Sequence, residues 1–373
     1  MDFEFSDEQE QLRDAVRRWV DKGFGFERRH ALAKAGGKTR AVLGELNELG
    51  LAGLVVPVAH GGMGFGAVEA MVVMEELGRG LVNAPYAQAA LVTPTLLSYA
   101  PAALQQAWLP KMAAGEALVV LAQQERSSRY RLDQAATQAS EAGGSWKLSG
   151  TKVVVPAGDE ADAFIVSARV AGAEGIALFA VDKGAAGLKL GGYPTQDGAR
   201  AADLLLADTP AMLLTLQGHA ALEHAADVAI AALCAEGVGL MDRMVAITVD
   251  YMHQRKQFGV ALATFQALRH RIADVKMQLE LGRSMSYYAS LKLGEPPEQR
   301  RRALSQAKVQ LGNSMRFVGQ QCTQIHGGIG VTDEYASSHY FKRMTVIELS
   351  FGDTMHHLGE VSARMRDTAG VFA

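Results

Sequence analysis

The sequence predicts an α+β protein with an N-terminal helical domain, a small central β domain and a C-terminal helical bundle. The chain has 373 residues, which is too long for one simple hydrophobic core. Apolar residues recur at helical spacing in the first third, change to short β-branched or alternating runs, and then return to helical spacing. We therefore expect domains over residues 1–117, 118–212 and 213–373.

The first domain is predicted to consist of short helices separated by turn residues. Ser6 followed by Gln9 is a capping-box start. A later helix is expected over residues 69–77, where Gly78 would stop it. Two further short helices are punctuated by Pro101 and Pro110.

The central domain is predicted to be a small antiparallel barrel or sandwich. Short runs of β-branched or alternating residues carry the signal, and glycines and charged turns separate them. The runs cover residues 118–122, 146–148, 152–155, 164–170 and 176–181.

The C-terminal domain is predicted to be helical from about Leu213 onward. A long helix begins at Thr264 and ends before Gly294 and Pro296. Its apolar face consists of Leu268, Ile272, Val275 and Leu279.

Composition excludes several classes of function. A net charge of −3 gives no electrostatic case for binding nucleic acid or an anionic membrane surface. No apolar run reaches the roughly 18 residues of a membrane span, and residues 1–4 lack the layout of a signal peptide. Cys234 and Cys322 are far apart and in no metal-ligand pattern. We expect a cytoplasmic protein without a metal, a nucleic-acid partner or a membrane partner.

The chain carries a series of motifs in a fixed order. The C-terminal part has Tyr251-x-x-x-Arg255-x-Gln257-Phe258-Gly259, Phe265-Gln266, Gln324-x-His326-Gly327-Gly328-x-Gly330 and Phe351-Gly352-Asp353-Thr354. The N-terminal part has Pro57 with Gly61-Gly62-x-Gly64, Glu75-Glu76-Leu77-Gly78-Arg79 and Trp108-Leu109-Pro110. In this order and spacing the motifs resemble the acyl-CoA dehydrogenase family of flavoenzymes, and the resemblance covers nearly the whole chain.

The resemblance implies a fold, a cofactor and partners. The fold would be an N-terminal helical domain, a central small β-barrel domain and a C-terminal four-helix bundle. The reaction would be α,β-dehydrogenation of an acyl-CoA thioester, in which a base removes the α proton and FAD accepts a hydride. The expected partners are electron-transfer flavoprotein as electron acceptor and other subunits of a homo- or heterotetramer.

The resemblance also places cofactor contacts on this chain. The residues matching Arg255 and Phe258 reach across a dimer interface in the family to a neighbour's FAD, where a guanidinium suits a pyrophosphate. Gln257 and Gln266, in the same motifs, are also expected to contact the cofactor. Arg255 alone also fits a surface arginine that caps a helix C-terminus.

A second group of cofactor contacts matches the segment whose backbone approaches the adenosine part of the same FAD. It consists of Gln324, Gly327 and Gly328, where glycines allow close approach. A Gly-Gly-x-Gly run by itself is more often a turn. His326 is predicted to be structural. Thr354 matches a family threonine near the cofactor, but on general grounds it is a helix N-cap.

The expected catalytic base is missing from its usual position. Members of the family usually end the series with Tyr-Glu-Gly-Thr, in which the Glu is the base, and here Gly352 occupies that position. Asp353, the next residue, is the candidate base. An equal alternative is that Asp353 only begins a helix, where the helix dipole stabilises its negative charge. Some members place the base on the long preceding helix, but the matching position is Ala229, and Glu236 is a poor substitute.

The central domain departs from the family pattern as well. The usual aromatic and hydroxyl residues beside the flavin ring are replaced by Val154 and Pro156, and proline removes a backbone donor. Ser128-Arg129-Tyr130 and the Phe-Gly-Asp ending resemble the small subunits of two-gene enzymes of the pimeloyl-CoA dehydrogenase type. The pair His356-His357 with Glu360 matches no metal-ligand spacing.

Three functions remain open on the sequence. In the first, the chain is an FAD-dependent acyl-CoA dehydrogenase subunit with Asp353 or another residue as base. Alternatively, it is a non-catalytic partner that completes the FAD site of a large subunit, or a flavin oxidase or monooxygenase on the same fold. The first two are favoured, as a small subunit that forms competent sites only with its partner.

Overall fold

The computed structural model describes residues 5–170, 172 and 175–368. The signal-peptide expectation for residues 1–4 therefore lies outside the described residues. The chain divides into two compact units. Unit 1 comprises Met1–His30, Ala67–Val82 and Ile230–Ala373, and unit 2 comprises Ala31–Gly66 and Asn83–Ala229.

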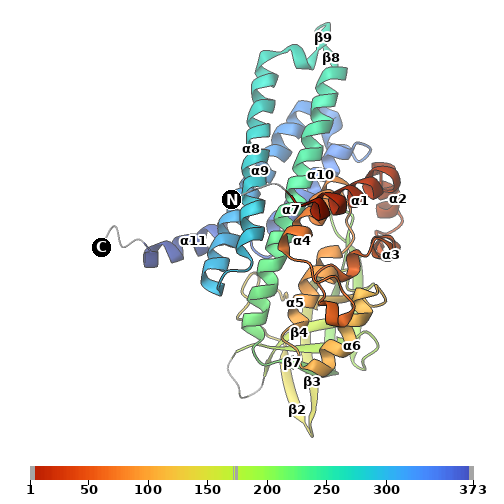
Figure 1. Cartoon of the computed structure of the whole chain (residues 1–373), viewed down its shortest axis with the longest axis vertical. Helices are drawn as coiled ribbons and strands as arrows, with labels where there is room; N and C mark the ends of the chain where they lie inside the picture. The colour runs from red at the N-terminus through yellow and green to blue at the C-terminus, as the bar shows by residue number, and fades with distance from the viewer. Residues whose placement is uncertain (1–4, 171, 173–174, 369–373) are drawn as a thin grey trace. The chain divides into compact units, whose positions relative to one another are not determined.

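Unit 1 is built from helices and one small hairpin (Figure 1). Its elements are α1 (Asp7–Gly23), the start of α2 (Phe26–Lys34), α4 (Ala67–Arg79), most of α7 (Gly218–Gln254), β8 (Lys256–Gln257), β9 (Val260–Ala261), η4 (Leu262–Thr264), α8 (Gln266–Lys292), α9 (Pro297–His326), η5 (Gly327–Val331), α10 (Ala336–Leu349) and α11 (Thr354–Thr368).

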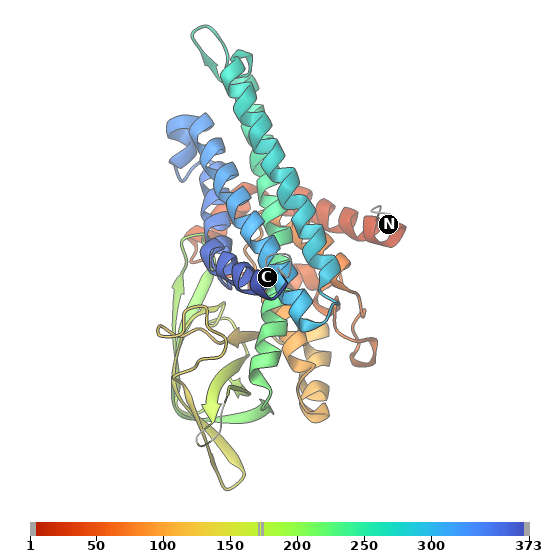
Figure 2. The same ribbon diagram turned by 90° about the vertical axis from the view of Figure 1, so that its left-hand side faces the viewer.

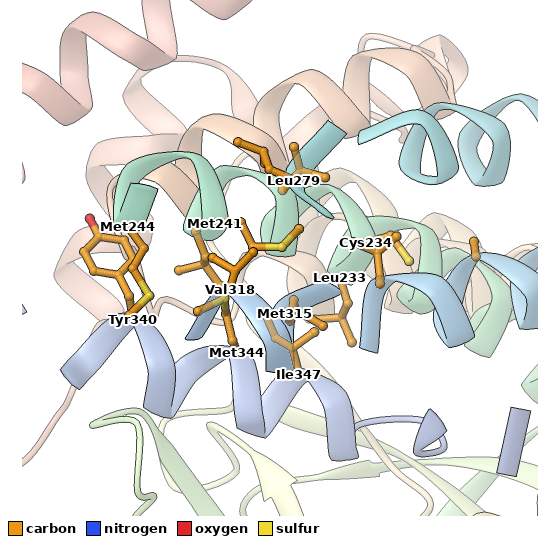
Figure 3. Packing of buried hydrophobic residues seen from close by; sticks show 14 of the residues in the cluster. Leu233, Cys234, Met241, Met244, Leu279, Met315, Val318, Tyr340, Met344 and Ile347 are labelled. Carbon is orange, nitrogen blue, oxygen red and sulfur yellow. The ribbon is translucent and has the colours of Figure 1, made fainter. Parts of the chain in front are cut away.

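The core of unit 1 is one cluster of buried apolar side chains from α7, α8, α9 and α10. Figure 3 shows Met241 and Met244 of α7 facing Val318 of α9 and Tyr340 of α10. Leu279 of α8 belongs to the same cluster and is fully buried. The helical C-terminal domain expected from the periodicity is confirmed, because one apolar stripe of each helix faces this shared core. The expected start at about Leu213 was wrong, because a strand continues to Thr215 and α7 begins at Gly218.

Local capping and close packing set the first helices of unit 1. The capping box at Ser6 and Gln9 is confirmed, with both reciprocal hydrogen bonds present. The prediction that Gly78 stops a helix was wrong, because α4 continues to Arg79. A Cβ on Gly78 would lie 2.1 Å from the carbonyl oxygen of Glu236 on α7. Gly78 is therefore a packing residue that lets two helix backbones approach closely.

Unit 2 combines short helices with a seven-stranded sheet. Its helices are the rest of α2, α3 (Arg40–Glu48), η1 (Leu51–Gly53), η2 (Val58–His60), the π-helical η3 (Ala87–Val92), α5 (Thr93–Leu97), α6 (Ala102–Ala113) and the first turns of α7. Its strands are β1 (Val119–Ala122), β2 (Gln138–Ala142), β3 (Ser145–Pro156), β4 (Ala163–Val170), β5 (Ala177–Asp182), β6 (Leu188–Pro194) and β7 (Arg200–Thr215).

The sheet of unit 2 is mixed rather than purely antiparallel. Strand β4 pairs in parallel with β1 and β2 and antiparallel with β5, and β7 pairs antiparallel with β3, β5 and β6. The expectation of an antiparallel sheet was wrong on this point. The separate runs predicted at 146–148 and 152–155 form the single strand β3. Pro101 precedes α6 as expected, but Pro110 lies within α6.

Within the described residues, no helix combines the length and the apolar character that crossing a membrane requires.

Candidate functional site

The Arg255 motif forms an exposed hairpin at the end of two long helices (Figures 1 and 2). Helix α7 ends at Gln254, and the amide of Arg255 donates to the carbonyl of Tyr251 at 2.8 Å. Strands β8 and β9 then turn the chain back into α8. Phe258 occupies the tip with φ of 54° and is 91% exposed. Phe258 and Gly259, with φ of 54° and 82°, form the two-residue loop between β8 and β9, and positive φ at both positions is typical of such a hairpin turn.

The other hairpin residues predicted to contact a cofactor are also exposed. The side chains of Arg255, Gln257 and Gln266 face solvent. The carbonyl of Arg255 accepts from the amide of Leu262 at 2.9 Å, which fixes the hairpin backbone. The guanidinium is thus presented on a defined backbone, and its planar donors suit a phosphate or a carboxylate.

The Gln324 motif contacts helix α7 through His326. The hydroxyl of Tyr251 donates to the carbonyl of His326 at 3.3 Å, and the two rings are 4.7 Å apart. The sequence-separated motifs are therefore brought together in unit 1. Gln324 is exposed, and a Cβ added at Gly327 or Gly328 would meet nothing within 4 Å. This open surface of backbone is suited to close approach by a ligand.

His326 acts as a structural residue in this segment. Its side chain is buried, and Nδ1 donates to the carbonyl of Cys322 at 2.8 Å. Burial lowers the pKa of the imidazole below its usual value. The His326 ring contacts the rings of Tyr251 and Tyr335, which links α7, α9 and the loop before α10.

Two buried side chains, Lys308 and His357, hold the turn Phe351–Thr354. Lys308 on α9 donates from Nζ to the carbonyls of Ile347, Glu348 and Gly352 at 2.8–2.9 Å. Burial lowers the pKa of Lys308 to about 8. Sequence reasoning missed this lysine, although Lys308 lies on the apolar stripe of α9, where a charged residue is unusual.

His357 holds the same turn from the side of α11. Its Nε2–H donates to the carbonyl of Phe351 at 3.0 Å, and Nδ1 accepts from the hydroxyl of Ser305 at 3.1 Å. Both ring nitrogens are therefore used by the neutral imidazole. Burial is the main cause that lowers the pKa of His357 to about 3, and the charge of Lys308 adds to it.

Position 352 has no room for a side chain. Gly352 has φ of 110°, a conformation that residues with a Cβ rarely adopt. A Cβ placed there would lie 2.5 Å from Cδ2 of His356 and 2.6 Å from Nε2 of His357. In the conformation of this structure, the two imidazoles occupy the space that a glutamate at position 352 would need.

Asp353 and Thr354 form the start of α11. The carboxylate of Asp353 accepts from the amide of His356 at 2.8 Å, which is the bond of a helix N-cap. The expectation that Thr354 is the N-cap was wrong. Thr354 is the first helical residue, and its hydroxyl donates to the carboxylate of Glu348 at 2.8 Å.

The substitute base on α7 is engaged in an ion pair. Glu236 is buried, and both carboxylate oxygens accept from the guanidinium of Arg343, one of them at 2.8 Å. Both oxygens of this carboxylate are therefore occupied by Arg343.

In unit 2, the segment around Val154 is an irregular part of strand β3. The register of β3 against β7 shifts between Lys152 and Val155. Val154 has φ of 53°, which is strained for a β-branched residue, and its side chain is partly exposed. Its amide donates to the carboxylate of Asp203 at 3.1 Å, and Tyr193 donates to the same oxygen at 2.9 Å.

A buried ion pair supports this segment. Nζ of Lys152 lies 2.7 Å from the carboxylate of Glu125, and both side chains are almost fully buried. The same carboxylate accepts from the amide of Ala136 and from the amide and hydroxyl of Thr137. The pair is fully hydrogen-bonded, which identifies it as structural support for the loop between β1 and β2.

One group of residues in the described ranges is close enough to share a metal ion: His30, Asp333 and His339. Nδ1 of His339 accepts from the guanidinium of Arg29, so its proton is on Nε2, which donates to the carbonyl of Asp333 at 2.7 Å. In this structure the group forms a hydrogen-bonded network.

Comparison with known proteins identifies the family. The N-terminal, middle and C-terminal domain models of acyl-CoA dehydrogenase match residues 6–116, 121–207 and 217–366. Long-chain specific acyl-CoA dehydrogenase, a mitochondrial protein of Sus scrofa, is 27% identical over 96% of this chain and 86% of that protein.

Two solved structures are similar over nearly the whole chain. A variant of the Tcur3481-Tcur3483 steroid ACAD is 28% identical with a TM-score of 0.86, and the match covers 97% of this chain and 99% of the other. The ChsE4-ChsE5 complex of Mycobacterium tuberculosis is 23% identical with a TM-score of 0.87, covering 99% and 100%, and supports the fold alone. The chain therefore belongs to the acyl-CoA dehydrogenase family, a family of FAD-dependent oxidoreductases that act on acyl-CoA thioesters.

Proposed function

We propose that this chain is the small subunit of a heteromeric acyl-CoA dehydrogenase of the two-gene, pimeloyl-CoA dehydrogenase type. In this proposal it lends residues to an FAD site on a large subunit and forms competent sites only with that partner. The closed position at Gly352 carries the proposal. Its φ of 110° and the two imidazoles around it leave no room for a glutamate at the position where the family usually carries its base.

The residues that this chain would contribute to the partner's FAD site are exposed, as that contact requires. Arg255 and Gln257 on the hairpin, and Gln324 on α9, are exposed, and Gly328 offers open backbone. A guanidinium and nearby backbone amides suit the pyrophosphate of FAD, so these residues fit the cofactor. When bound, the flavin accepts the hydride from the β carbon of the thioester. The chain's own contribution would be to bind and orient the phosphate end.

The half of a flavin site that the chain would build for itself is poorly equipped. Pro156 has no amide proton to donate, and the amide of Val154 is already bonded to Asp203. The names of two similar structures pair two gene products, which supports a heteromeric assembly for this chain as a proposal.

The alternative that Asp353 is the base keeps this chain catalytic by itself. One oxygen of that carboxylate caps α11, so a capping function already explains the residue. The substitution Asp353→Asn separates the two roles because asparagine is an equally good N-cap but cannot accept a proton. We expect unchanged thermal stability and unchanged dehydrogenase activity of the heteromer in a dye-reduction assay. Loss of activity with stability retained would establish Asp353 as the base.

Flavin content tests the heteromeric proposal directly. The chain purified alone should carry substoichiometric FAD by absorbance and show little activity with acyl-CoA substrates. Co-purification with a large acyl-CoA dehydrogenase subunit should restore flavin, and Arg255→Gln should lower the FAD content of that complex. Arg269→Gln, an exposed arginine on α8, is the control. Full flavin occupancy and rapid acyl-CoA-dependent dye reduction by the lone chain would overturn the proposal.

The remaining expectations from the sequence extend this proposal. The substrate would be an acyl-CoA, and electron-transfer flavoprotein would accept the electrons. The three-domain division at 1–117, 118–212 and 213–373 remains a proposal, which the matched family ranges support. A small barrel in the central domain is supported by strand pairings that lead from β4 through β2, β3, β7 and β5 back to β4. A cytoplasmic location is supported by the two buried free thiols.

A further inference from the structure

A cavity in unit 1 combines arginine side chains with aromatic walls. Its volume is about 150 Å³, and it lies between the α1–α2 junction, the end of α4, α7 and the start of α10. The lining residues are Val20, Asp21, Phe24, Gly25, Phe26, Arg29, Arg79, Gly80, Leu81, Arg243, Ile247, Ala336 and Tyr340. A cavity of this volume can hold a molecule about the size of benzene. None of the residues predicted to contact the flavin cofactor lines it.

Positive charge predominates in the wall of this cavity. Three arginines line it, at positions 29, 79 and 243, against the single carboxylate of Asp21. Asp21 is more than half exposed, so water screens its charge. Arg29, by contrast, is almost fully buried. An anion that enters would meet three guanidinium groups, two of them shielded from bulk water.

Arg29 and Arg79 are each held by a residue that does not line the cavity. Arg29 donates to Nδ1 of His339, whose own proton is committed to Asp333. Nε of Arg79 donates to Glu76 at 2.7 Å. Its Nη2 forms an ion pair with the carboxylate of Asp21 at 2.9 Å. These contacts hold the Arg79 guanidinium at the cavity wall.

The remaining wall is apolar and carries one hydroxyl. Tyr340 is buried, and its hydroxyl donates to the carbonyl of Arg79 at 2.8 Å, so its oxygen is fixed at the cavity. Burial raises the pKa of Tyr340 to about 12, while the charges of the three arginines act in the opposite direction. Phe24, Leu81 and Ile247 provide surface for a short hydrocarbon body.

We propose that this cavity binds a small organic oxyanion, a carboxylate or phosphate with a short apolar body, through Arg29, Arg79 and Arg243. The planar guanidinium donors match the paired oxygens of such groups. The volume excludes an intact CoA thioester, so the ligand is distinct from the substrate class of the family. The proposal does not depend on the heteromeric role of the chain.

The test uses calorimetric titration of the full chain with three probes: butyrate, benzoate and inorganic phosphate, each against sodium chloride at the same ionic strength. Saturable binding of at least one probe is expected. Two variants locate it. Arg243→Gln removes a charge at the exposed rim and should weaken binding about tenfold, which is the usual effect of losing a charge-assisted hydrogen bond. Ala336→Leu keeps every charge but fills the cavity and should abolish binding.

Arg18→Gln is the matched control, because Arg18 is exposed on α1 and does not line the cavity. It should bind like the parent chain. Circular dichroism verifies that each variant is folded, and Arg243 is exposed enough for its replacement to leave the core untouched. The proposal is overturned if no probe binds beyond chloride. It is equally overturned if either Arg243→Gln or Ala336→Leu binds as tightly as Arg18→Gln.

Discussion

Two regions of unit 1 carry the family's motifs in opposite physical states. The turn Phe351–Thr354 is held by buried bonds from Lys308 and His357, and its glycine has no space around it. The hairpin around Phe258 is exposed, and a Cβ on Gly259 would meet nothing within 4 Å. The motif that should hold a base is closed and internally hydrogen-bonded, whereas the motif that should reach a cofactor is exposed to solvent.

This difference distinguishes the absence of a catalytic base from the loss of a binding function. A decayed active site would be expected to leave unpaired polar groups and loose packing. Instead, the turn at Gly352 is bonded through Lys308, Ser305 and His357. The hairpin keeps an exposed aromatic residue at its turn that contributes little to the stability of unit 1. The contrast supports a chain that retains its outward-facing role.

The largest effect is expected from Lys308→Met. The substitution leaves the carbonyls of Ile347, Glu348 and Gly352 without this buried donor, and each such loss costs about 1–3 kcal/mol. We expect the free energy of unfolding in urea to fall by about 3 kcal/mol or more. Lys276→Met, which removes an exposed pair with Glu280, should cost less than about 0.5 kcal/mol. Similar losses in both variants would mean that the turn is not fixed by Lys308.

Matched glycine substitutions compare the two regions directly. Gly352→Ala combines a positive φ with contacts at 2.5–2.6 Å and should cost about 3 kcal/mol. Gly259→Ala has φ of 82° in open space and should cost only the backbone term of about 1 kcal/mol. Urea unfolding of both variants measures the difference. Equal costs would show that the turn can relax to admit a side chain.

The buried imidazole of His357 should make the stability of unit 1 depend on pH. Its folded pKa of about 3 lies below the value of about 6.5 in the unfolded chain, so the unfolded state binds the extra proton in between. The stabilisation is complete above pH 6.5 and is lost as the pH falls toward 3, by up to about 1.4 kcal/mol per pH unit. His357→Asn should flatten the measured slope between pH 6 and 4. The exposed His253→Asn is the control and should leave the slope unchanged.

The smallest effect on stability is expected at the hairpin tip. Phe258→Ala removes a side chain that is 91% exposed, so the unfolding free energy should change by less than about 0.5 kcal/mol. The same substitution should weaken assembly with a flavin-bearing large subunit, measured by size-exclusion chromatography and FAD content. A large loss of stability with normal assembly would reverse the comparison between the two regions.

Local signals predicted much of the fold. The capping box at Ser6 and the long helix from Gln266 depend on residues a few positions apart, and both are present. Strands β6 and β7 were not predicted. Strand β6 contains glycines and is largely exposed, so its sequence lacks a clear alternation of apolar and polar residues. The parallel pairing of β1 with β4 was missed because strand order depends on contacts between distant segments.

The sequence by itself determined the family, through the order of its motifs, and showed that Gly352 stands where a glutamate is usual. Only the tertiary structure decided that this position is closed, because His356 and His357 pack where a Cβ would lie. It also assigned Asp353 to the N-cap of α11 and revealed Lys308 beneath the turn. Residues 308 and 352 are 44 positions apart. Their contact depends on how α9 packs against α10 and α11, which no local spacing encodes.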